Sequence, residues 1–197
     1  MGGFKIRKFV INKIVETCHY LYQRKLVSGK GGNVSCKFED SGEVKIAITG
    51  SGTSFKTIEN KDVLITDLSS NILSGDGKPS SELGMHLAIY KKRPDLNSIV
   101  HTHSPYTAGF AFSDKKLKRL EGFGAIKNEF ISMVEYAPPG SIELANYTSK
   151  AMEKENVVLL KSHGLIVAEK DIDEAALLAE FIEESAKTQL VGYILSL

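Results

Sequence analysis

The hydrophobic and polar positions of the chain follow a helical period near the N-terminus. Apolar side chains recur every three to four residues from Ile6 to Leu21, within a stretch that spans residues 4–27. This spacing places the apolar groups on one face of a helix. The pattern therefore predicts an amphipathic helix, which the sequence SGKGGN ends.

A strand pattern follows. Two apolar-rich runs, 33–38 and 43–50, flank the turn sequence EDSGE, and a third run covers 62–68. Short runs of this kind, separated by turn residues, are typical of strands and hairpins. We therefore expect an antiparallel hairpin and a further strand in this part of the chain.

The rest of the chain alternates between the two patterns. Helices are predicted from Ser80 or Ser81 to Pro94, and over 105–113, 141–155 and 171–195, the last capped by Asp171. Strands are predicted over 97–103, 130–136, 157–161 and 164–169, whereas 114–130 fits neither pattern. Adjacent strands mixed with helices predict a single α/β domain over residues 1–197, a three-layer α/β/α sandwich with a largely antiparallel central sheet.

Charge and cysteine content exclude several classes of function. The 25 Lys and Arg residues nearly balance the 24 Asp and Glu residues, so no global field attracts nucleic acid or a membrane surface. The sequence shows neither a secretory leader nor an apolar run of membrane-spanning length, and we expect a cytoplasmic protein. Cys18 and Cys36 are too isolated to form a disulfide framework or a CxxC zinc site, and we expect both to be reduced and buried.

Two of the five histidines, His101 and His103, lie two residues apart at the end of an apolar run. In a strand they project from the same face, which suits a metal but equally suits the wet face of a strand end. A third histidine, His163 in KSHGLIV, lies in a predicted turn from which it could reach the same sheet end. Three neutral imidazoles are a zinc-ligand set that leaves a fourth position open for water or substrate.

Glu82 lies in the sequence PSSE, at or next to a predicted helix N-terminus. A glutamate there can simply favour the helix dipole, or it can face a metal and transfer a proton to or from a substrate. His86 follows one turn later, and we expect it to be a neighbour of such a site rather than a ligand. His19 falls near the apolar stripe of the first helix and is expected to be structural.

Three short stretches could hold an anion, namely 31–35, 49–53 and 80–81. Each offers small side chains, hydroxyl groups and exposed backbone N–H groups, which are the donors that phosphate prefers. Each is also an ordinary turn when taken alone, and none matches a P-loop or a dinucleotide-binding fingerprint.

Several of these sequences, taken together, resemble the class II aldolase and ribulose-phosphate epimerase family, in order and over most of the chain. The resemblance rests on GNVS, TGSGTSF, PSSELGMHLAIYKKRPDLNSIVHTHSPYTAGFA, APPGSIELA and SHGLIVAEKDIDEA. It implies that one zinc ion per subunit is bound by His101, His103 and His163, and that Glu82 is the catalytic acid/base. It further implies that a substrate phosphate is held by Asn33, Ser51, Gly52, Ser80 and Ser81.

Within this family the sequence is most similar to the branch that cleaves L-fuculose 1-phosphate reversibly to dihydroxyacetone phosphate and L-lactaldehyde. Glu82 differs from the aspartate that is typical of the epimerase branch. The resemblance also implies a homotetramer with active sites near subunit interfaces. A neighbouring subunit could then supply the proton donor to the aldehyde oxygen, for which residues 122–130 are the candidate segment.

Two alternatives stay open. The first is another zinc enzyme of the same family, a methylthioribulose-1-phosphate dehydratase or a related sugar-phosphate lyase or epimerase. The second is a zinc-binding assembly or regulatory domain without catalysis. A purely structural zinc would need neither Glu82 nor three anion-binding stretches, so the sequence favours an enzyme.

Overall fold

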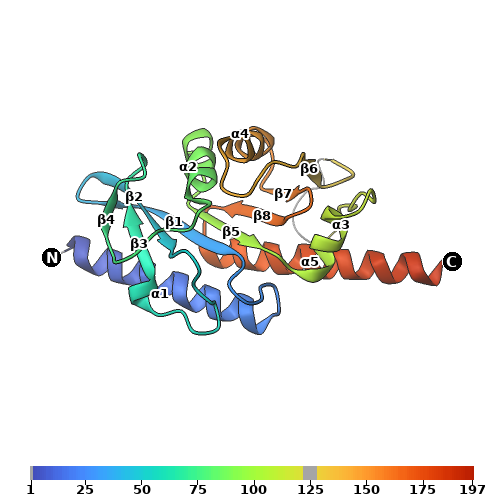
Figure 1. Cartoon of the computed structure of the whole chain (residues 1–197), viewed down its shortest axis with the longest axis horizontal. Helices are drawn as coiled ribbons and strands as arrows, with labels where there is room; N and C mark the ends of the chain where they lie inside the picture. The colour runs from blue at the N-terminus through green and yellow to red at the C-terminus, as the bar shows by residue number, and fades with distance from the viewer. Residues whose placement is uncertain (1, 122–127) are drawn as a thin grey trace.

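The computed structural model describes residues 2–121 and 128–197, and a single eight-stranded sheet runs through them (Figure 1). The strands are β1 (Asn33–Asp40), β2 (Glu43–Thr49), β3 (Val63–Thr66), β4 (Ile72–Ser74), β5 (Ser98–Thr102), β6 (Ser132–Val134), β7 (Val157–Leu160) and β8 (Gly164–Glu169). Their order across the sheet is β4-β3-β2-β1-β5-β8-β7-β6. The central pair, β1 and β5, therefore joins segments that are distant in the sequence.

The predicted α/β class is confirmed, but the sheet is mixed, because one of its pairs is parallel, which the expectation of a largely antiparallel sheet did not include. Strands β6 and β7 pair in parallel, whereas the other neighbouring pairs are antiparallel. The chain passes from β6 to β7 through helix α4 (Ile142–Ala151). A crossover helix of this kind returns the chain to the same end of the sheet, and the two strands then run in the same direction.

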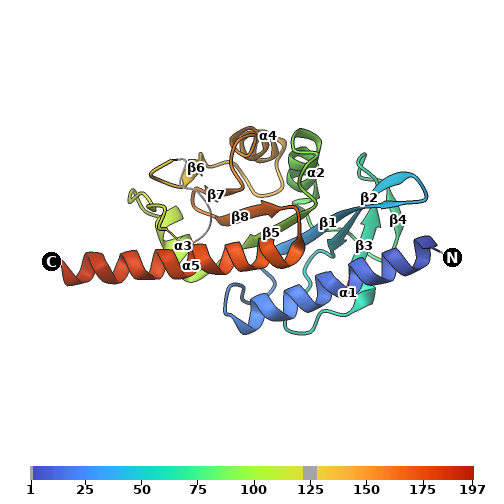
Figure 2. The same ribbon diagram turned by 180° about the vertical axis from the view of Figure 1, so that it is seen from behind.

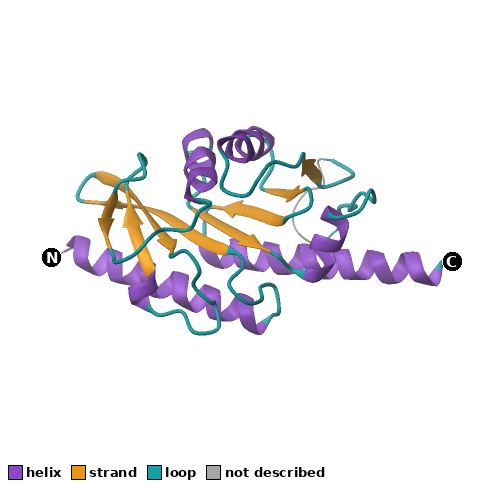
Figure 3. Ribbon diagram, viewed as in Figure 1, coloured by secondary structure: helices purple, strands orange, loops and turns teal. Residues whose placement is uncertain are grey.

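Helices cover both faces of the sheet (Figures 1 and 3). The remaining helices are α1 (Gly2–Gln23), the short 3₁₀ helix η1 (Asn60–Asp62), α2 (Leu83–Lys92), α3 (Pro105–Ala111) and α5 (Ile172–Leu195). Helices α2 and α4 pack on one face, and α1, α3 and α5 pack on the other, where Figure 2 shows α5 continuing past the sheet. None of the described helices is long and apolar enough to cross a bilayer.

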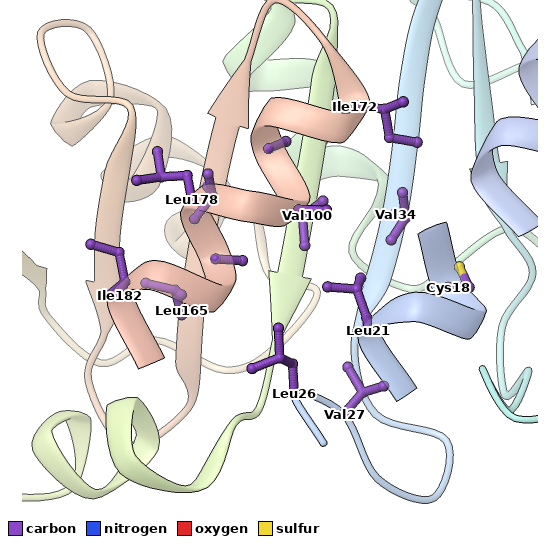
Figure 4. Packing of buried hydrophobic residues seen from close by; sticks show 14 of the residues in the cluster. Cys18, Leu21, Leu26, Val27, Val34, Val100, Leu165, Ile172, Leu178 and Ile182 are labelled. Carbon is purple, nitrogen blue, oxygen red and sulfur yellow. The ribbon is translucent and has the colours of Figure 1, made fainter. Parts of the chain in front are cut away.

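Two hydrophobic clusters separate the helices from the sheet. Alternate residues of β7 enter different clusters: Val157 and Leu159 join the one beside α1 and α5, while Val158 and Leu160 join the one beside α2 and α4. This division follows from the period of two along a strand. Figure 4 shows part of the first cluster, in which side chains from both long helices meet the sheet.

Both cysteines are free and buried, as predicted from the sequence. Burial raises the pKa of the Cys36 thiol to about 12, so this side chain is a neutral thiol at physiological pH. Cys18 packs in the first cluster, with none of its surface exposed. The two residues therefore act as small apolar side chains.

Several predicted element boundaries are confirmed by local hydrogen bonds. The Asp171 carboxylate accepts from the backbone N–H groups of Asp173 and Glu174 and so caps α5. Pro105 begins α3 at the position where its missing N–H has no cost. The turn between β1 and β2 consists of Ser41 and Gly42, both with positive φ, which gives a tight two-residue hairpin.

Other boundaries differ from the prediction. Neither Ser80 nor Ser81 is the N-cap of α2, because the helix begins at Leu83 and Glu82 occupies the cap position. The backbone N–H of Ser80 donates to the Thr49 carbonyl, which keeps the chain extended beside β2. Strand β4 was not predicted. Of the candidate segment 122–130, residues 122–127 lie outside the described part of the chain.

Candidate metal centre

The three histidines singled out in the sequence meet at one end of the central sheet. His101 lies in β5, His103 follows directly after that strand, and His163 lies in the turn between β7 and β8. Strands β5 and β8 are neighbours, with His101 opposite Ile166 in the register. This pairing brings the turn that carries His163 beside the end of β5. The left-handed conformation of Ser162, with φ of 54°, makes that turn short.

The imidazole Nε2 atoms of these residues point at a common centre. Nε2 of His101 lies 2.9 Å from Nε2 of His103 and 3.2 Å from Nε2 of His163. A tetrahedral zinc ion with Zn–N bonds of about 2.0–2.1 Å would separate two such nitrogens by roughly 3.3 Å. The potential ligand atoms of all three residues lie within 4.8 Å of one another. The cluster is therefore of the right size for one metal ion.

Hydrogen bonding decides which form of His101 faces the centre. Its Nδ1 lies 2.8 Å from the carbonyl oxygen of Leu165, which can only accept, so Nδ1 carries a proton. In the neutral ring, Nε2 then carries a lone pair that is directed at the centre. A backbone carbonyl that orients a ligating imidazole in this way is typical of metal sites. The residues present thus fit a bound cation.

The Glu82 carboxylate adds negative charge to the same centre. Its Oε2 lies 3.2 Å from Nε2 of His101, and its Oε1 lies 3.6 Å from Nε2 of His163. The side-chain amide of Asn33 donates to Oε2 at 2.9 Å, whereas Oε1 is buried and accepts no hydrogen bond from any described residue. The two oxygens therefore differ: Oε2 accepts a hydrogen bond from Asn33, and Oε1 accepts none from the described residues.

The pKa values of these groups follow from their burial and from their interactions with one another. Burial alone would raise the pKa of the Glu82 carboxyl, but the nearby imidazoles of His101 and His163 hold it below its usual range. Burial and the neighbouring histidines lower the pKa of His103 and of His163 to about 4. The pKa of His101 is raised despite its burial, because Glu82 stabilises its charged form.

Three glycines allow the close packing of this site, a role that was not predicted for them from the sequence. A Cβ atom on Gly31 would lie 2.9 Å from Nδ1 of His103. Gly32 has a φ of 79°, and a Cβ there would lie 2.7 Å from the His101 carbonyl oxygen. On Gly164, which follows His163, a Cβ would lie 2.4 Å from the Thr102 carbonyl oxygen. The pair GG before Asn33 and the glycine after His163 were the available signals.

The three candidate anion-binding stretches are brought together. The Thr49 hydroxyl accepts from the backbone N–H of Val34, and a β-bridge joins Gly50 to Pro79. Some donors are already used, because the Ser51 N–H donates to the Lys78 carbonyl. Of the five candidate residues, Asn33 and Ser80 are buried, while Ser51, Gly52 and Ser81 are exposed.

The remaining two histidines are not members of the cluster. His86 is fully buried on α2, and its Nδ1 lies 2.7 Å from the Ser35 hydroxyl. Burial lowers its pKa to about 3, so the ring is neutral. His19 lies on α1, with its Nε2 3.1 Å from the Ile58 carbonyl oxygen. His86 is therefore a neighbour of Glu82 whose Nδ1 bonds to Ser35 and not to the carboxylate.

The fold and the histidine cluster together define an α/β protein with a candidate metal centre at one end of its sheet. The family model described as Class II Aldolase and Adducin N-terminal domain matches residues 12–190. The chain therefore belongs to the class II aldolase family and is an enzyme of the lyase class, as the sequence resemblance implied.

Individual relatives support this assignment. An L-fuculose phosphate aldolase of Methanococcus maripaludis strain C5 is 40% identical over 181 residues, covering 92% of this chain and 96% of that protein. A solved structure of an L-fuculose 1-phosphate aldolase superposes with a TM-score of 0.84 at 30% identity, over 94% of this chain and 87% of that chain.

The family also contains related activities. A 5-deoxy-D-ribulose 1-phosphate aldolase of Bacillus thuringiensis is 36% identical, covering 84% of this chain and 79% of that protein. A 3-oxo-tetronate 4-phosphate decarboxylase of Haemophilus influenzae is 30% identical, covering 88% of this chain and 83% of that protein. Similarity at this level thus spans more than one substrate and more than one reaction.

Proposed function

We propose that the protein is a zinc-dependent aldolase that reversibly cleaves a ketose 1-phosphate, with L-fuculose 1-phosphate as the first candidate, to dihydroxyacetone phosphate and L-lactaldehyde. The observation that carries this proposal is the convergence of three imidazole nitrogens on one centre, with the Glu82 carboxylate beside two of them. The names of two of the relatives described above support the same substrate class.

The proposed ligands of the zinc ion are His101, His103 and His163, with one ion per subunit. The lone pair of His101 and the lowered pKa values of the other two rings support this set, because a ligating imidazole must be neutral. When bound, zinc would act as a Lewis acid toward the carbonyl and hydroxyl oxygens of the substrate.

Glu82 is the proposed acid/base that removes a proton from the carbon of dihydroxyacetone phosphate that forms the new bond. Its Oε1 is the atom suited to this role, because it is buried and accepts no hydrogen bond from the described residues. The Asn33 amide holds the other oxygen and so fixes the direction in which Oε1 points. A general base in such a position typically contributes about 10²–10⁴ in rate.

The proposed phosphate site consists of Asn33, Ser51, Gly52, Ser80 and Ser81. Two observations support it: the stretches that contain these residues lie side by side, and Asn33 has a second amide N–H beyond the one that Glu82 accepts. The site would hold the anion with neutral donors. Loss of one hydroxyl should therefore raise KM for the sugar phosphate without changing the zinc content.

We further propose that the chain forms a homotetramer with active sites near the subunit interfaces, as the family resemblance implies. Sedimentation velocity tests this directly. A fully active monomer at low concentration would contradict both the tetramer and a proton donor supplied by a neighbouring subunit.

The proposed activity can be tested with three phosphorylated substrates taken from the relatives: L-fuculose 1-phosphate, 5-deoxy-D-ribulose 1-phosphate and 3-oxo-tetronate 4-phosphate. Release of dihydroxyacetone phosphate is measured for the first two, and release of carbon dioxide for the third. Each assay is repeated after chelation and again after zinc is restored. We expect zinc-dependent cleavage of a ketose 1-phosphate; decarboxylation alone, or no turnover at all, would contradict the proposal.

A further inference from the structure

A row of buried polar side chains connects helix α2 to strand β1. Asn33 and Ser35 lie on β1, and Glu82, His86 and Tyr90 lie at the start of α2 and along it. The Asn33 amide donates to the Glu82 carboxylate. The Ser35 hydroxyl lies 2.7 Å from Nδ1 of His86, and the same hydroxyl lies 2.8 Å from the Tyr90 hydroxyl. We call this set of five residues the polar ladder. Only its first contact belongs to the proposed catalytic site.

The spacing of the ladder matches the periods of the two elements. Residues 33 and 35 project from one face of β1, about 6.6 Å apart along the strand. Residues 82, 86 and 90 are each four apart, so they lie on one face of the helix with a rise of about 6 Å per step. Because the two spacings agree, neighbouring contacts form together in a single register.

The ladder is buried within an otherwise hydrophobic layer. Ser35 and His86 are fully buried, and Tyr90 exposes only 2% of its surface. The Tyr90 hydroxyl also reaches the backbone carbonyl of Ser35, at 3.1 Å. Apolar residues of α2 such as Leu87 and Ile89 pack in the cluster beside it. Hydrophobic packing would tolerate a small slide or rotation of the helix, whereas directed hydrogen bonds would not.

Such a slide would change the site directly. Glu82 precedes the first residue of α2, and its carboxylate lies 3.2 Å from His101 and 3.6 Å from His163. A misplacement of about 1 Å at a catalytic group can cost on the order of 100-fold in rate. The contacts of His86 with Ser35 therefore lie where they can control the position of the carboxylate.

We propose that His86 and Ser35 are positioning residues for Glu82: they fix the rotation and depth of α2 on β1, and thereby the place of the carboxylate beside the metal centre. This inference rests on the proposed function of Glu82, but not on the identity of the sugar. Neither residue touches the substrate. Their effect should appear in the rate of proton transfer, not in the metal content or in KM.

The experiment measures exchange of the dihydroxyacetone phosphate proton with solvent, together with KM, zinc content and thermal stability. The variants are Ser35→Ala, His86→Leu and His86→Asn, in which the amide can still bond to Ser35. The matched control is Ser98→Ala. Ser98 is also a buried strand serine, 3% exposed, and its hydroxyl lies 3.6 Å from the Cys36 sulfur, away from the ladder.

We expect Ser35→Ala and His86→Leu to slow exchange by about 10–100-fold, with full zinc content and a KM within roughly twofold of the original. His86→Asn should recover most of the rate, and Ser98→Ala should keep it despite a similar loss of stability. Unchanged exchange in Ser35→Ala and His86→Leu alongside lowered stability would overturn the ladder alone. Absence of exchange in the unsubstituted enzyme would overturn the proposed function, and the ladder with it.

Discussion

Substitution of Gly164 by alanine should damage the metal centre without replacing any candidate ligand. Gly164 directly follows His163 and begins β8. A Cβ atom at this position would lie 2.4 Å from the Thr102 carbonyl oxygen and 3.0 Å from Cδ2 of His103. The first contact falls about 1 Å inside ordinary van der Waals distance. Its partner is backbone, so no side-chain rotation can relieve it.

The expected magnitude follows from these two contacts. Overpacking a well-packed site costs about 1–3 kcal/mol of unfolding free energy, and a clash with backbone belongs in the upper part of that range. For a chain of this size, about 2–3 kcal/mol lowers Tm by roughly 4–12 °C. The His103 ring must also move away from the new methyl group. By analogy with the loss of a group that orients a ligand, zinc affinity should fall by about 10–100-fold.

The chain offers a matched control in Gly84→Ala. Gly84 lies in α2, and a Cβ atom there would meet nothing within 4 Å. Alanine favours a helix over glycine by up to about 1 kcal/mol, so this variant should be slightly more stable and bind zinc normally. Thermal unfolding and zinc titration are measured for both variants. A Gly164→Ala protein with unchanged Tm and zinc affinity would refute the close packing of β8 against His103.

Three further predictions concern the ligands and the fold. His103→Ala should reduce the metal content well below one zinc per chain, as measured by elemental analysis, while a protein that keeps stoichiometric zinc would exclude this ligand. Zinc affinity should weaken by about tenfold per unit as pH falls from 6.5 to 5, because one proton on His101, whose pKa is raised, competes with the metal. His103 and His163 stay neutral until their pKa of about 4, so a dependence on three protons in this window would contradict the account. Asp171→Ala removes the cap of α5 and should cost about 0.5–2 kcal/mol in a denaturant titration, with the exchange rate of dihydroxyacetone phosphate unchanged.

The elements that the sequence predicted well are those with a local cause. The cap at Asp171, the proline that begins α3 and the hairpin turn at Ser41 and Gly42 each depend on a few adjacent residues. Strand β8 was predicted at its observed bounds because its apolar run lies between clear turn residues. Patterns of this kind can be recognised in the sequence because the structures they produce do not depend on distant contacts.

The elements that the sequence missed depend on distant contacts. Strand β4 is three residues long, has no buried residue, and is defined only by its pairing with β3. The parallel pairing of β6 with β7 follows from the path through α4 and leaves no mark on residue alternation. Helix α2 begins at Leu83 and not at Ser80 or Ser81 as predicted, because the backbone N–H of Ser80 donates to the Thr49 carbonyl.

The candidate site shows the same division. Three imidazoles were predicted at one end of the sheet, from the i, i+2 spacing of His101 and His103 and from the glycine after His163. In the structure these three side chains do converge. The contact between Asn33 and Glu82 joins residues 49 positions apart, and no pattern within either segment indicates it. The sequence could therefore suggest which residues gather at the site, but not how the carboxylate is held.

Proton exchange in a Glu82→Gln variant tests most directly whether Glu82 is the acid/base of the proposed reaction. Glutamine keeps the shape of the side chain and can still accept from Asn33, but it cannot take a proton from the substrate. Zinc content and the exchange of the dihydroxyacetone phosphate proton with solvent are measured side by side. We expect stoichiometric zinc with exchange slowed by about 10²–10⁴-fold. Exchange at the original rate in a zinc-loaded Glu82→Gln protein would contradict this expectation, and would leave Glu82 as an acid that merely favours the start of α2.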